Sequence, residues 1–276
     1  MNVFDTMLSR YEIITNDDYT NALHEVMQQI ALAGLYRGGF FEHAAFYGGT
    51  CLRVFHKLDR FSEDVDFSLL QPNREFKLED YFQPIINEFT ALGREVVINK
   101  KEKKNESNVE SAFLKDDTVI YNLQFRTERS IKIKIELDIN PPLGFSTESK
   151  LLLLPYSFMT RCYTLPSLYA GKMHALLFRK WNNRVKGRDW YDFEWYLKNN
   201  VSLDFTHLCQ RIEQFESMNM EQMTHESFKK LLKEKIANTN MDMVKADVKP
   251  FIKNSVQLEI WSADYFTQLV DMIMFA

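Results

Sequence analysis

Glycine is scarce in this chain, and its scarcity limits the folds that the chain can adopt. Only nine of the 276 residues are glycine, which is roughly half the usual share of about 7%. A sandwich of many short hairpins needs tight turns that usually contain glycine. Four of the nine glycines form two doublets, Gly38-Gly39 and Gly48-Gly49. We therefore expect a helix-rich chain with few tight hairpins.

Composition and charge indicate an ordinary globular protein. Hydrophobic residues make up 45% of the chain and charged residues 26%, which is typical of soluble domains. The net charge of −4 argues against a histone-like nucleic-acid coat, although a local basic groove remains compatible with it. The three cysteines, Cys51, Cys162 and Cys209, form no CxxC pair. This favours a reducing compartment over a disulfide framework or a zinc site.

The sequence predicts a cytoplasmic protein that does not associate with a membrane. The N-terminal residues MNVFDTMLSRYE include acidic side chains and lack the apolar core of a signal peptide. The longest aliphatic run, at 151–154, ends at Pro155 and is too short to span a bilayer.

Hydrophobic periodicity predicts an α+β fold in two parts. Apolar residues at helical spacing predict helices at 17–36, 51–58 and 78–92, with Asn16 or Asp17 as N-cap of the first and Gly38-Gly39 as its stop. Short apolar or alternating runs predict strands at 44–47, 65–70, 94–98, 119–126 and 131–139. After Pro166 the pattern is helical, at 167–181, 189–198 and from 201 to 276. We predict an α/β domain at 1–155 and a helical domain at 156–276.

The last predicted strand separates its residues into two faces. Isoleucines and leucine at 131, 133, 135, 137 and 139 lie on one face, and Lys132, Lys134, Glu136 and Asp138 lie on the other. Because side chains alternate along a strand, one face would pack in the core while the other presents charged groups.

A glycine doublet and a pair of aspartates form a second pattern, which indicates phosphate and metal binding. Gly48-Gly49 at the entry to a helix lets backbone N–H groups approach a phosphate closely. Asp64 and Asp66, two residues apart on a strand, point to the same side and could hold Mg²⁺ through carboxylate oxygens. Each motif alone is common in turns and solvated loops, but their order along the chain makes coincidence less plausible. Asp138 or Glu136 could supply a third carboxylate.

These residues resemble a known signature. The stretch GGTCLRVFHKLDRFSEDVDF is similar to the motif of the AbiEii/AbiGii toxin family, a branch of the DNA polymerase β-like nucleotidyltransferase superfamily. That motif reads Gly-Gly-Thr/Ser, a short helix, then Arg-x-Ser/Thr-x-Asp-x-Asp. The matching positions are Gly48, Gly49, Thr50, Arg60, Ser62, Asp64 and Asp66. A lysine on a later helix, Lys172, and Arg-Asp-x-x-Asp at 188–192 also match, so that the resemblance covers about residues 44–197.

The resemblance implies a nucleotidyltransferase-fold mixed sheet with flanking helices, followed by a helical part. It implies transfer of a nucleoside monophosphate from an NTP to an acceptor, with loss of pyrophosphate. Asp64 and Asp66 would bind Mg²⁺, with Mn²⁺ as the alternative ion, and Asp138 is favoured over Glu136 as the third ligand. The residues expected to hold the triphosphate are Gly48, Gly49, Thr50, Arg60, Ser62 and Lys172. Of the two later carboxylates, Asp192 is favoured over Asp189 as the one that reaches the active site.

The family relationship further implies a toxin of a toxin–antitoxin or abortive phage infection system, with a cognate antitoxin encoded nearby. The acceptor would be RNA such as tRNA, or protein. Two alternatives are a catalytically inactive nucleotide-binding regulatory module and a house-keeping transferase that modifies a small molecule.

Three further features have no assigned role at this point. The aromatic group Trp181, Trp190, Trp195 and Tyr196 could stack on a nucleobase, although such residues more often pack helices. The basic run Arg179, Lys180, Arg184, Lys186 and Arg188 fits either an RNA contact or a solvated loop. The helical tail after about residue 201 could close over the cleft, bind the acceptor, or only pack the core.

Overall fold

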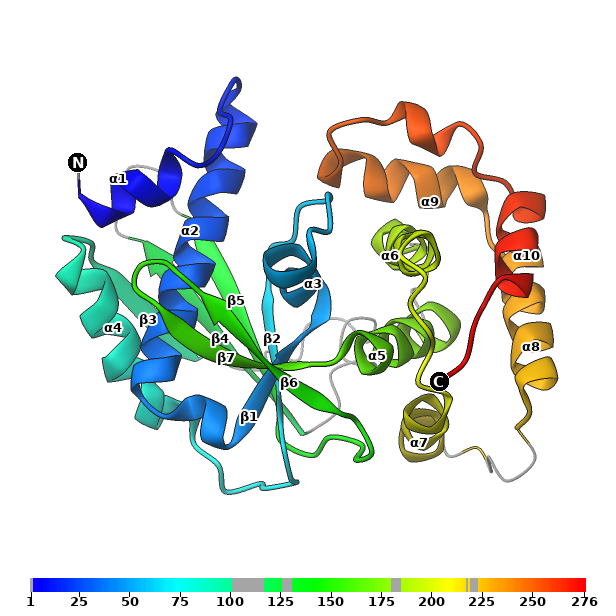
Figure 1. Cartoon of the computed structure of the whole chain (residues 1–276), viewed down its shortest axis with the longest axis horizontal. Coiled ribbons are helices and arrows are strands. Elements are labelled where there is room, and N and C mark those ends of the chain that lie inside the picture. Colours follow the sequence, from blue (N-terminus) through cyan, green and yellow to red (C-terminus); the bar gives the residue numbers. More distant parts are fainter. Residues whose placement is uncertain (1, 101–116, 126–130, 180–184, 217, 219–222) are drawn as a thin grey trace.

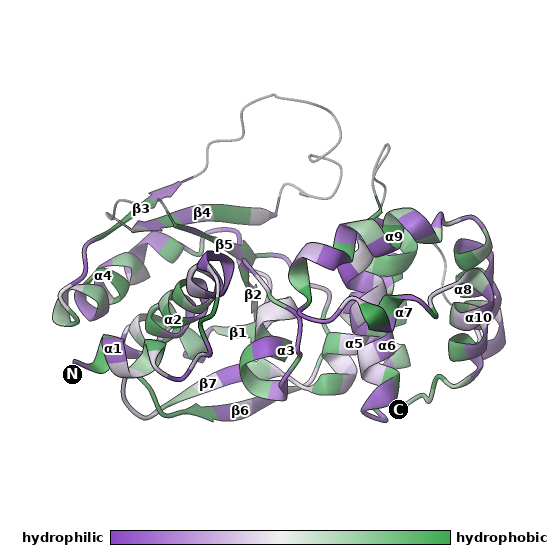
Figure 2. Ribbon diagram, turned by 90° about the horizontal axis from the view of Figure 1, so that it is seen from above, coloured by the Kyte–Doolittle hydropathy of each residue, from purple (hydrophilic) through white to green (hydrophobic). Residues whose placement is uncertain are grey.

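A mixed β-sheet and a group of helices form the two halves of the molecule (Figure 1). The structure, a computed structural model, describes residues 2–100, 117–125, 131–179, 185–216, 218 and 223–276. Helices α1, α2 and α4 lie with the sheet, α5 to α10 form the other half, and α3 lies between the two (Figures 1 and 2). The α+β prediction is confirmed.

Seven strands form the sheet. Their spatial order is β3 (Val96–Lys100), β4 (Thr118–Phe125), β5 (Lys132–Asp138), β2 (Val65–Leu69), β1 (Ala44–Tyr47), β7 (Phe158–Tyr163) and β6 (Thr147–Leu152). The pairs β2–β5 and β1–β7 are parallel, and the other neighbours are antiparallel. The sheet is therefore mixed, and its centre is formed by β5, β2 and β1.

Ten α-helices are described. Those of the sheet half are α1 (Val3–Leu8), α2 (Asn16–Arg37) and α4 (Phe82–Ala91), and α3 (Gly48–His56) lies between the halves (Figure 1). Those of the helical half are α5 (Leu165–Phe178), α6 (Gly187–Lys198), α7 (Phe205–Glu216), α8 (His225–Ala237), α9 (Met241–Val248) and α10 (Ala263–Asp271). Short 3₁₀ turns lie at Phe40–Glu42, Leu78–Tyr81, Lys249–Phe251 and Val256–Leu258. No helix in the described ranges has the combination of length and apolar character needed to cross a membrane.

The alternation predicted for 131–139 is confirmed in β5. Ile133, Ile135 and Leu137 are fully buried on the face that packs toward α2. Lys134, Glu136 and Asp138 lie on the opposite face and line a cleft. One face of the sheet thus belongs to the hydrophobic core, while the other presents charged groups toward the helical half.

The N-cap and the C-terminal stop of α2 are explained by the residues at its two ends. Thr15, rather than the predicted Asn16 or Asp17, is the N-cap, because its side chain accepts from the backbone N–H of Asp18 and the Asp18 carboxylate accepts from the backbone of Thr15 in return. At the other end, Gly39 has φ +77°, a conformation that glycine adopts without strain. The first glycine doublet is a helix stop, as expected.

The sheet continues beyond the predicted domain boundary at residue 155. The strands β6 and β7 form a hairpin, and β7 lies parallel to β1 inside the sheet. The sheet therefore ends at Tyr163, and the helical half begins with α5 at Leu165. The division into two folding domains stays a prediction, but its boundary belongs after β7.

Candidate active site

A cleft of about 500 Å³ lies between the two halves. The sheet half contributes Tyr47, Gly48, Gly49, Arg60, Ser62, Asp64, Asp66, Lys134, Glu136 and Asp138 to its lining. The helical half contributes Lys172, His174, Phe178, Arg179, Lys186, Arg188, Arg211, Phe215 and Glu216. The structure thus brings together the glycine doublet, both aspartates and the lysine that the sequence analysis selected.

The second glycine doublet begins α3 at the edge of this cleft. Gly48 has φ +81°, and a Cβ atom at this position would collide with the carboxylate of Asp66. A Cβ atom on Gly49 would lie 2.7 Å from Nη2 of Arg60 and 3.0 Å from Oγ of Ser62. Both positions therefore need a bare backbone, which leaves the N–H groups at the start of α3 close to the charged lining.

Thr50 fixes the loop that carries Ser62 and Asp64. Its buried hydroxyl donates to the backbone carbonyl of Asp64 and lies 2.9 Å from the hydroxyl of Ser62. Thr50 is absent from the cleft lining, whereas Ser62 is part of it. The predicted contact of Thr50 with a phosphate stays a prediction, and the contacts described here give it the role of holding the loop.

Three carboxylates and one lysine meet on the polar face of the sheet. In the parallel pairing of β2 with β5, Asp66 lies directly beside Glu136. Nζ of Lys134 lies 2.5 Å from the carboxylate of Glu136 and 3.4 Å from that of Asp64. Burial, together with the nearby charges of Glu136 and Asp64, raises the pKa of Asp66 to about 7. Negative charge is therefore in excess around Asp66, and a cation would relieve it.

The register favours Glu136 over Asp138 as the carboxylate next to Asp66. Asp138 lies beside Ser68, two residues farther along β2, and its Oδ1 accepts from the backbone N–H of Asn140 at 3.0 Å. Asp138 still lines the cleft. Its role as a metal ligand stays a prediction, and the strand pairing gives Glu136 the better position.

The carboxylate pair Asp64 and Asp66 fits a hard divalent cation. Among the described residues, no group of three His, Cys, Asp or Glu side chains converges closely enough to hold a metal by itself. Mg²⁺ commonly binds proteins through one or two carboxylates and completes its shell with water and substrate phosphates. A pair of aspartates beside a glycine-rich helix start matches that mode of binding.

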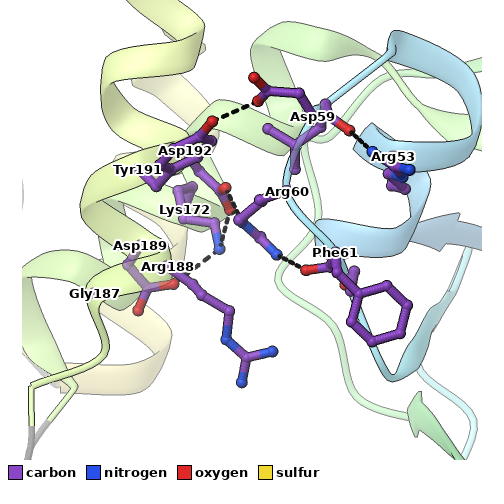
Figure 3. Close-up of polar contacts among 12 residues, drawn as sticks. Arg53, Asp59, Arg60, Phe61, Lys172, Gly187, Arg188, Asp189, Tyr191 and Asp192 are labelled. Atoms are coloured by element: carbon purple, nitrogen blue, oxygen red, sulfur yellow. Dashed lines mark hydrogen bonds and ion pairs between the residues drawn. The ribbon is translucent and has the colours of Figure 1, made fainter. Parts of the chain in front are cut away.

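Lys172 is held in place by two buried aspartates (Figure 3). Its Nζ lies 2.8 Å from Oδ1 of Asp189 and 2.8 Å from Oδ2 of Asp192. Asp192 also forms a two-pronged pair with Arg60, whose Nε and Nη2 each donate at 2.6 Å. Burial alone would raise the pKa of Asp192, but Arg60 and Lys172 hold it below its usual value. Asp192 therefore carries its charge between two cations.

Neither later aspartate lines the cleft, but both contact Lys172, which does, so the expectation that one of them reaches the active site stays a prediction. The side chain of Asp192 is 0% exposed and that of Asp189 is 3% exposed. The second oxygen of Asp189 accepts from Nη1 of Arg179 at 2.8 Å. Because the oxygens of both groups contact basic side chains, Asp189 and Asp192 position Lys172, Arg60 and Arg179. The sequence motif placed them near Lys172 but could not show which groups they pair with.

The loop at 57–64 joins the two halves. Tyr191 of α6 donates its hydroxyl to Asp59 at 2.6 Å, and the backbone N–H of Phe61 donates to the carbonyl of Phe251 at 2.8 Å. On its other side, the amide Nε2 of Gln28 in α2 donates to the carbonyls of Ser62 and Glu63, both at 3.0 Å. The segment that carries Ser62 and Asp64 is thus fixed from both halves of the molecule.

Several cleft cations were not selected as site residues from the sequence. Lys134 was noted only as part of the polar face, although its spacing from Glu136 could have identified it. Lys186 and Arg188 of the basic run line the cleft, while Lys180 and Arg184 lie outside the described residues. Burial and the nearby charge of Arg179 lower the pKa of Lys186 to about 7.

The aromatic group on the C-terminal helices belongs mainly to the core. Trp190 packs edge-on against Phe266, and Tyr196 is stacked on Tyr169 with ring centroids 4.3 Å apart. Trp190 and Tyr196 are buried, which supports helix packing over base stacking. Trp181 lies outside the described residues.

Comparison with protein families and with solved structures finds similar proteins. The family model described as "Nucleotidyl transferase AbiEii toxin, Type IV TA system" matches residues 30–270. Among solved structures, MenT4, a nucleotidyltransferase toxin from Mycobacterium tuberculosis, is similar with a TM-score of 0.60 and 13% identity, over 97% of this chain and 88% of that one. JHP933 from Helicobacter pylori aligns with a TM-score of 0.49 and 17% identity, over 91% of this chain and 89% of that one. The comparison with curated proteins finds no match.

Proposed function

Because the chain belongs to the nucleotidyl transferase AbiEii toxin family of type IV toxin–antitoxin systems, we propose that it transfers a nucleoside monophosphate from an NTP to a macromolecular acceptor, RNA such as tRNA or a protein, in the cytoplasm. The observation that best supports this proposal is that one cleft is lined by Gly48, Gly49, Asp64, Asp66 and Lys172. The toxin–antitoxin family implies an antitoxin as its partner and an NTP as its substrate.

The start of α3 holds the triphosphate. The backbone N–H groups at Gly48 and Gly49 and the positive end of the helix favour a bound anion. The hydroxyl of Ser62 faces the same part of the cleft and can donate to a phosphate oxygen. Lys172, on the helical half of the cleft lining, would supply a positive charge to the triphosphate.

Asp64 and Asp66 would hold Mg²⁺, and Glu136, which lies beside Asp66 in the strand pairing, could accept a hydrogen bond from a water on the ion. Such an ion would supply neutralisation of the phosphate charge when bound. The acceptor hydroxyl gives up its proton to solvent water as its oxygen forms a new bond to the α-phosphorus, the bond from that phosphorus to the bridging oxygen breaks, and pyrophosphate departs. Such transfers need mostly positioning and charge neutralisation, and the cleft residues supply both.

Lys134 must change its contacts when a metal binds. In the structure its Nζ neutralises Asp64 and Glu136. A divalent ion on the aspartates would compete with Lys134 for the carboxylate of Asp64.

The test is label transfer. The protein is incubated with Mg²⁺, each α-labelled NTP in turn, and cellular RNA or protein. We expect label on one acceptor class, and Asp66→Asn should lower its rate by on the order of a hundredfold or more. Asp264→Asn, on an exposed turn of α10, is the matched control and should transfer as the unchanged protein does.

Two outcomes would contradict the proposal. Absence of transfer with every NTP and both acceptor classes would reject the enzymatic function. Full activity of Asp66→Asn would instead reject the assignment of the site. Label on RNA or on protein identifies the acceptor class.

A further inference from the structure

The wall of the cleft formed by α5 and α7 contains a cluster that the phosphate and metal chemistry does not use. Two pairs of residues, each four positions apart on its helix, face one another where α5 and α7 pack: His174 with Phe178, and Arg211 with Phe215. Residues at this spacing lie on one face of a helix. All four line the cleft, as does Glu216.

The rings in this cluster lie close together. The ring of His174 is 5.4 Å from that of Phe178 and 5.4 Å from that of Phe215. The guanidinium of Arg211 lies 5.3 Å from the centre of the Phe215 ring. Both phenylalanines are only half-buried, so part of their surface faces the cleft. A flat aromatic ligand would find ring faces and a guanidinium plane to stack on.

Polar groups border these rings. Oε1 of Glu216 lies 3.3 Å from Nε2 of His174, and the Glu216 side chain is 23% exposed. Nε of Arg211 is buried and has no hydrogen-bond partner within the described residues. One acceptor and one donor are thus placed beside the aromatic faces, which is the combination that small-molecule sites use to orient a ligand.

This combination selects among ligand classes. A second phosphate group would meet the negative charge of Glu216, and a purely apolar group would leave the buried Nε of Arg211 without a hydrogen-bond partner. A nucleobase has two flat faces for stacking and an edge with hydrogen-bond donors and acceptors. We infer that the corner lined by His174, Phe178, Arg211, Phe215 and Glu216 binds a nucleobase in the same cleft as the phosphates.

The inference rests on the proposed function, since it assumes that nucleotides enter this cleft. The base has two possible sources, the incoming NTP and the terminal nucleotide of an RNA acceptor. Both present the same chemistry to the cluster, and binding measurements can separate them.

The principal variant is Phe215→Ala, with Phe205→Ala as matched control. Phe205 is on the same helix but packs against His225 and Phe275 outside the cleft. Phe215→Trp restores a ring at the site. All variants are first compared by thermal unfolding, so that a loss of binding is interpreted only for folded protein.

Calorimetric titration with Mg²⁺ present compares two pairs of probes. One pair is an NTP and inorganic tripolyphosphate, which lacks a base. The other pair is a short single-stranded RNA and the same RNA with an abasic terminal nucleotide. We expect Phe215→Ala to weaken one base-containing probe by about tenfold, as typical of a lost stacking contact, with no change for its baseless partner. Phe215→Trp should bind as tightly as the unchanged protein.

The probe that weakens identifies the source of the base. Unchanged affinity for both base-containing probes would overturn the inference, as would an equal loss for a probe and its baseless partner. Failure of label transfer with these affinities intact would contradict the proposed function and leave the nucleobase site standing.

Glu216→Gln provides a second test that does not depend on ring packing. A carboxylate only accepts hydrogen bonds, whereas an amide both donates and accepts. The substitution should therefore change the order of affinity among the four bases, in the NTP or at the RNA terminus. A uniform fall for all four would show that Glu216 does not contact the base.

Discussion

Among single residues, Gly48 and Asp66 form the contact that joins the backbone proposed to bind phosphate to the candidate metal site. Gly48 is in the left-handed conformation, and its missing Cβ leaves the space that the Asp66 carboxylate occupies. Any side chain at position 48 would therefore displace a carboxylate as well as strain the backbone. Position 48 therefore requires glycine for two reasons. One is its positive φ, and the other is the space that the Asp66 carboxylate occupies.

A comparison of Gly48→Ala with Gly93→Ala separates the effect of backbone strain from the effect of the contact with Asp66. Gly93 also has positive φ, at +70°, but a Cβ there would meet nothing within 4 Å. We expect Gly93→Ala to cost about 1–2 kcal/mol in unfolding free energy from backbone strain alone, with unchanged transfer activity. Gly48→Ala should cost more and should abolish activity and weaken Mg²⁺ binding. Urea unfolding and the label-transfer assay measure these effects, and equal behaviour of the two variants would contradict the role of the Asp66 contact.

The pKa of Asp66 predicts a pH-dependent response to metal. Burial, Glu136 and Asp64 raise this pKa from 3.8 to about 7 in the metal-free protein. Because the folded state holds a proton that the unfolded state releases, the stability contributed by this carboxyl is full below about pH 4 and is lost as pH rises through about 7. Mg²⁺ binds the deprotonated form. The stabilisation of the folded protein by Mg²⁺ should therefore increase as pH rises through the pKa of Asp66, at about 7.

The measurement is the melting temperature with and without Mg²⁺, from about pH 5.5 to about pH 8. The increase caused by Mg²⁺ should be larger at the higher pH. In Asp66→Asn the increase should be small and nearly independent of pH. A Mg²⁺ effect in the unchanged protein that does not vary with pH would contradict this prediction.

At the scale of elements, the loop at 57–64 links the start of β2 to both halves of the molecule. It is held by Gln28 of α2 on one side and by α6 on the other. Its strongest link is the buried pair of Arg60 and Asp192, with side chains 3% and 0% exposed. A buried pair of this kind orders the groups around it, and removal of one partner leaves the other charge uncompensated.

A double-mutant cycle tests this link. Asp192→Leu should lower the free energy of unfolding by about 3–5 kcal/mol, because Arg60 is left buried without its partner. The double variant Arg60→Met with Asp192→Leu should lose less than the sum of the two single variants. Asp271→Asn, which removes the partner of Lys233 in an exposed ion pair, should change stability by less than about 1 kcal/mol. Additive losses at positions 60 and 192 would contradict the coupling.

The sequence predicts elements well where one face of an element is buried and the other is polar. The alternation of β5 is of this kind. Helix α2 also formed as predicted, although its second half is buried on all sides, from Ile30 to Leu35. The hairpin of β6 and β7 was missed, because β6 is an edge strand without a buried face and β7 buries the polar Thr160. Local patterns do not report contacts between distant residues. The motif therefore located Asp192, while its pairing with Arg60, 132 positions away, follows only from the fold.

At the scale of the whole molecule, the two halves share one continuous interface that includes the cleft. The hydrophobic core extends from α2 and the sheet through α5 and α6 to α8 and α10. The loop at 57–64 adds polar links across the same boundary. We therefore expect the halves to unfold together.

The positions of the tryptophans allow a direct test. All four, Trp181, Trp190, Trp195 and Trp261, occur after residue 165, so tryptophan fluorescence reports on the C-terminal half. Far-UV circular dichroism reports on both halves. In urea the two signals should give coincident transitions, as expected for a single cooperative unit. A fluorescence transition at lower urea than the dichroism transition would show that the helical half unfolds on its own.

The pairing of Arg60 with Asp192 also links the loop at 57–64, which contributes to one wall of the cleft, to α6. One wall is the polar face of the sheet, the other is formed by α5 and α7, and this pair holds the loop of the first to α6 beside the second. Movement of the walls apart would separate two buried charges, at a cost of several kcal/mol. The pair therefore resists separation of the two walls, and we expect the substrates of the proposed reaction to enter the cleft without a large movement of α6 away from the loop at 57–64.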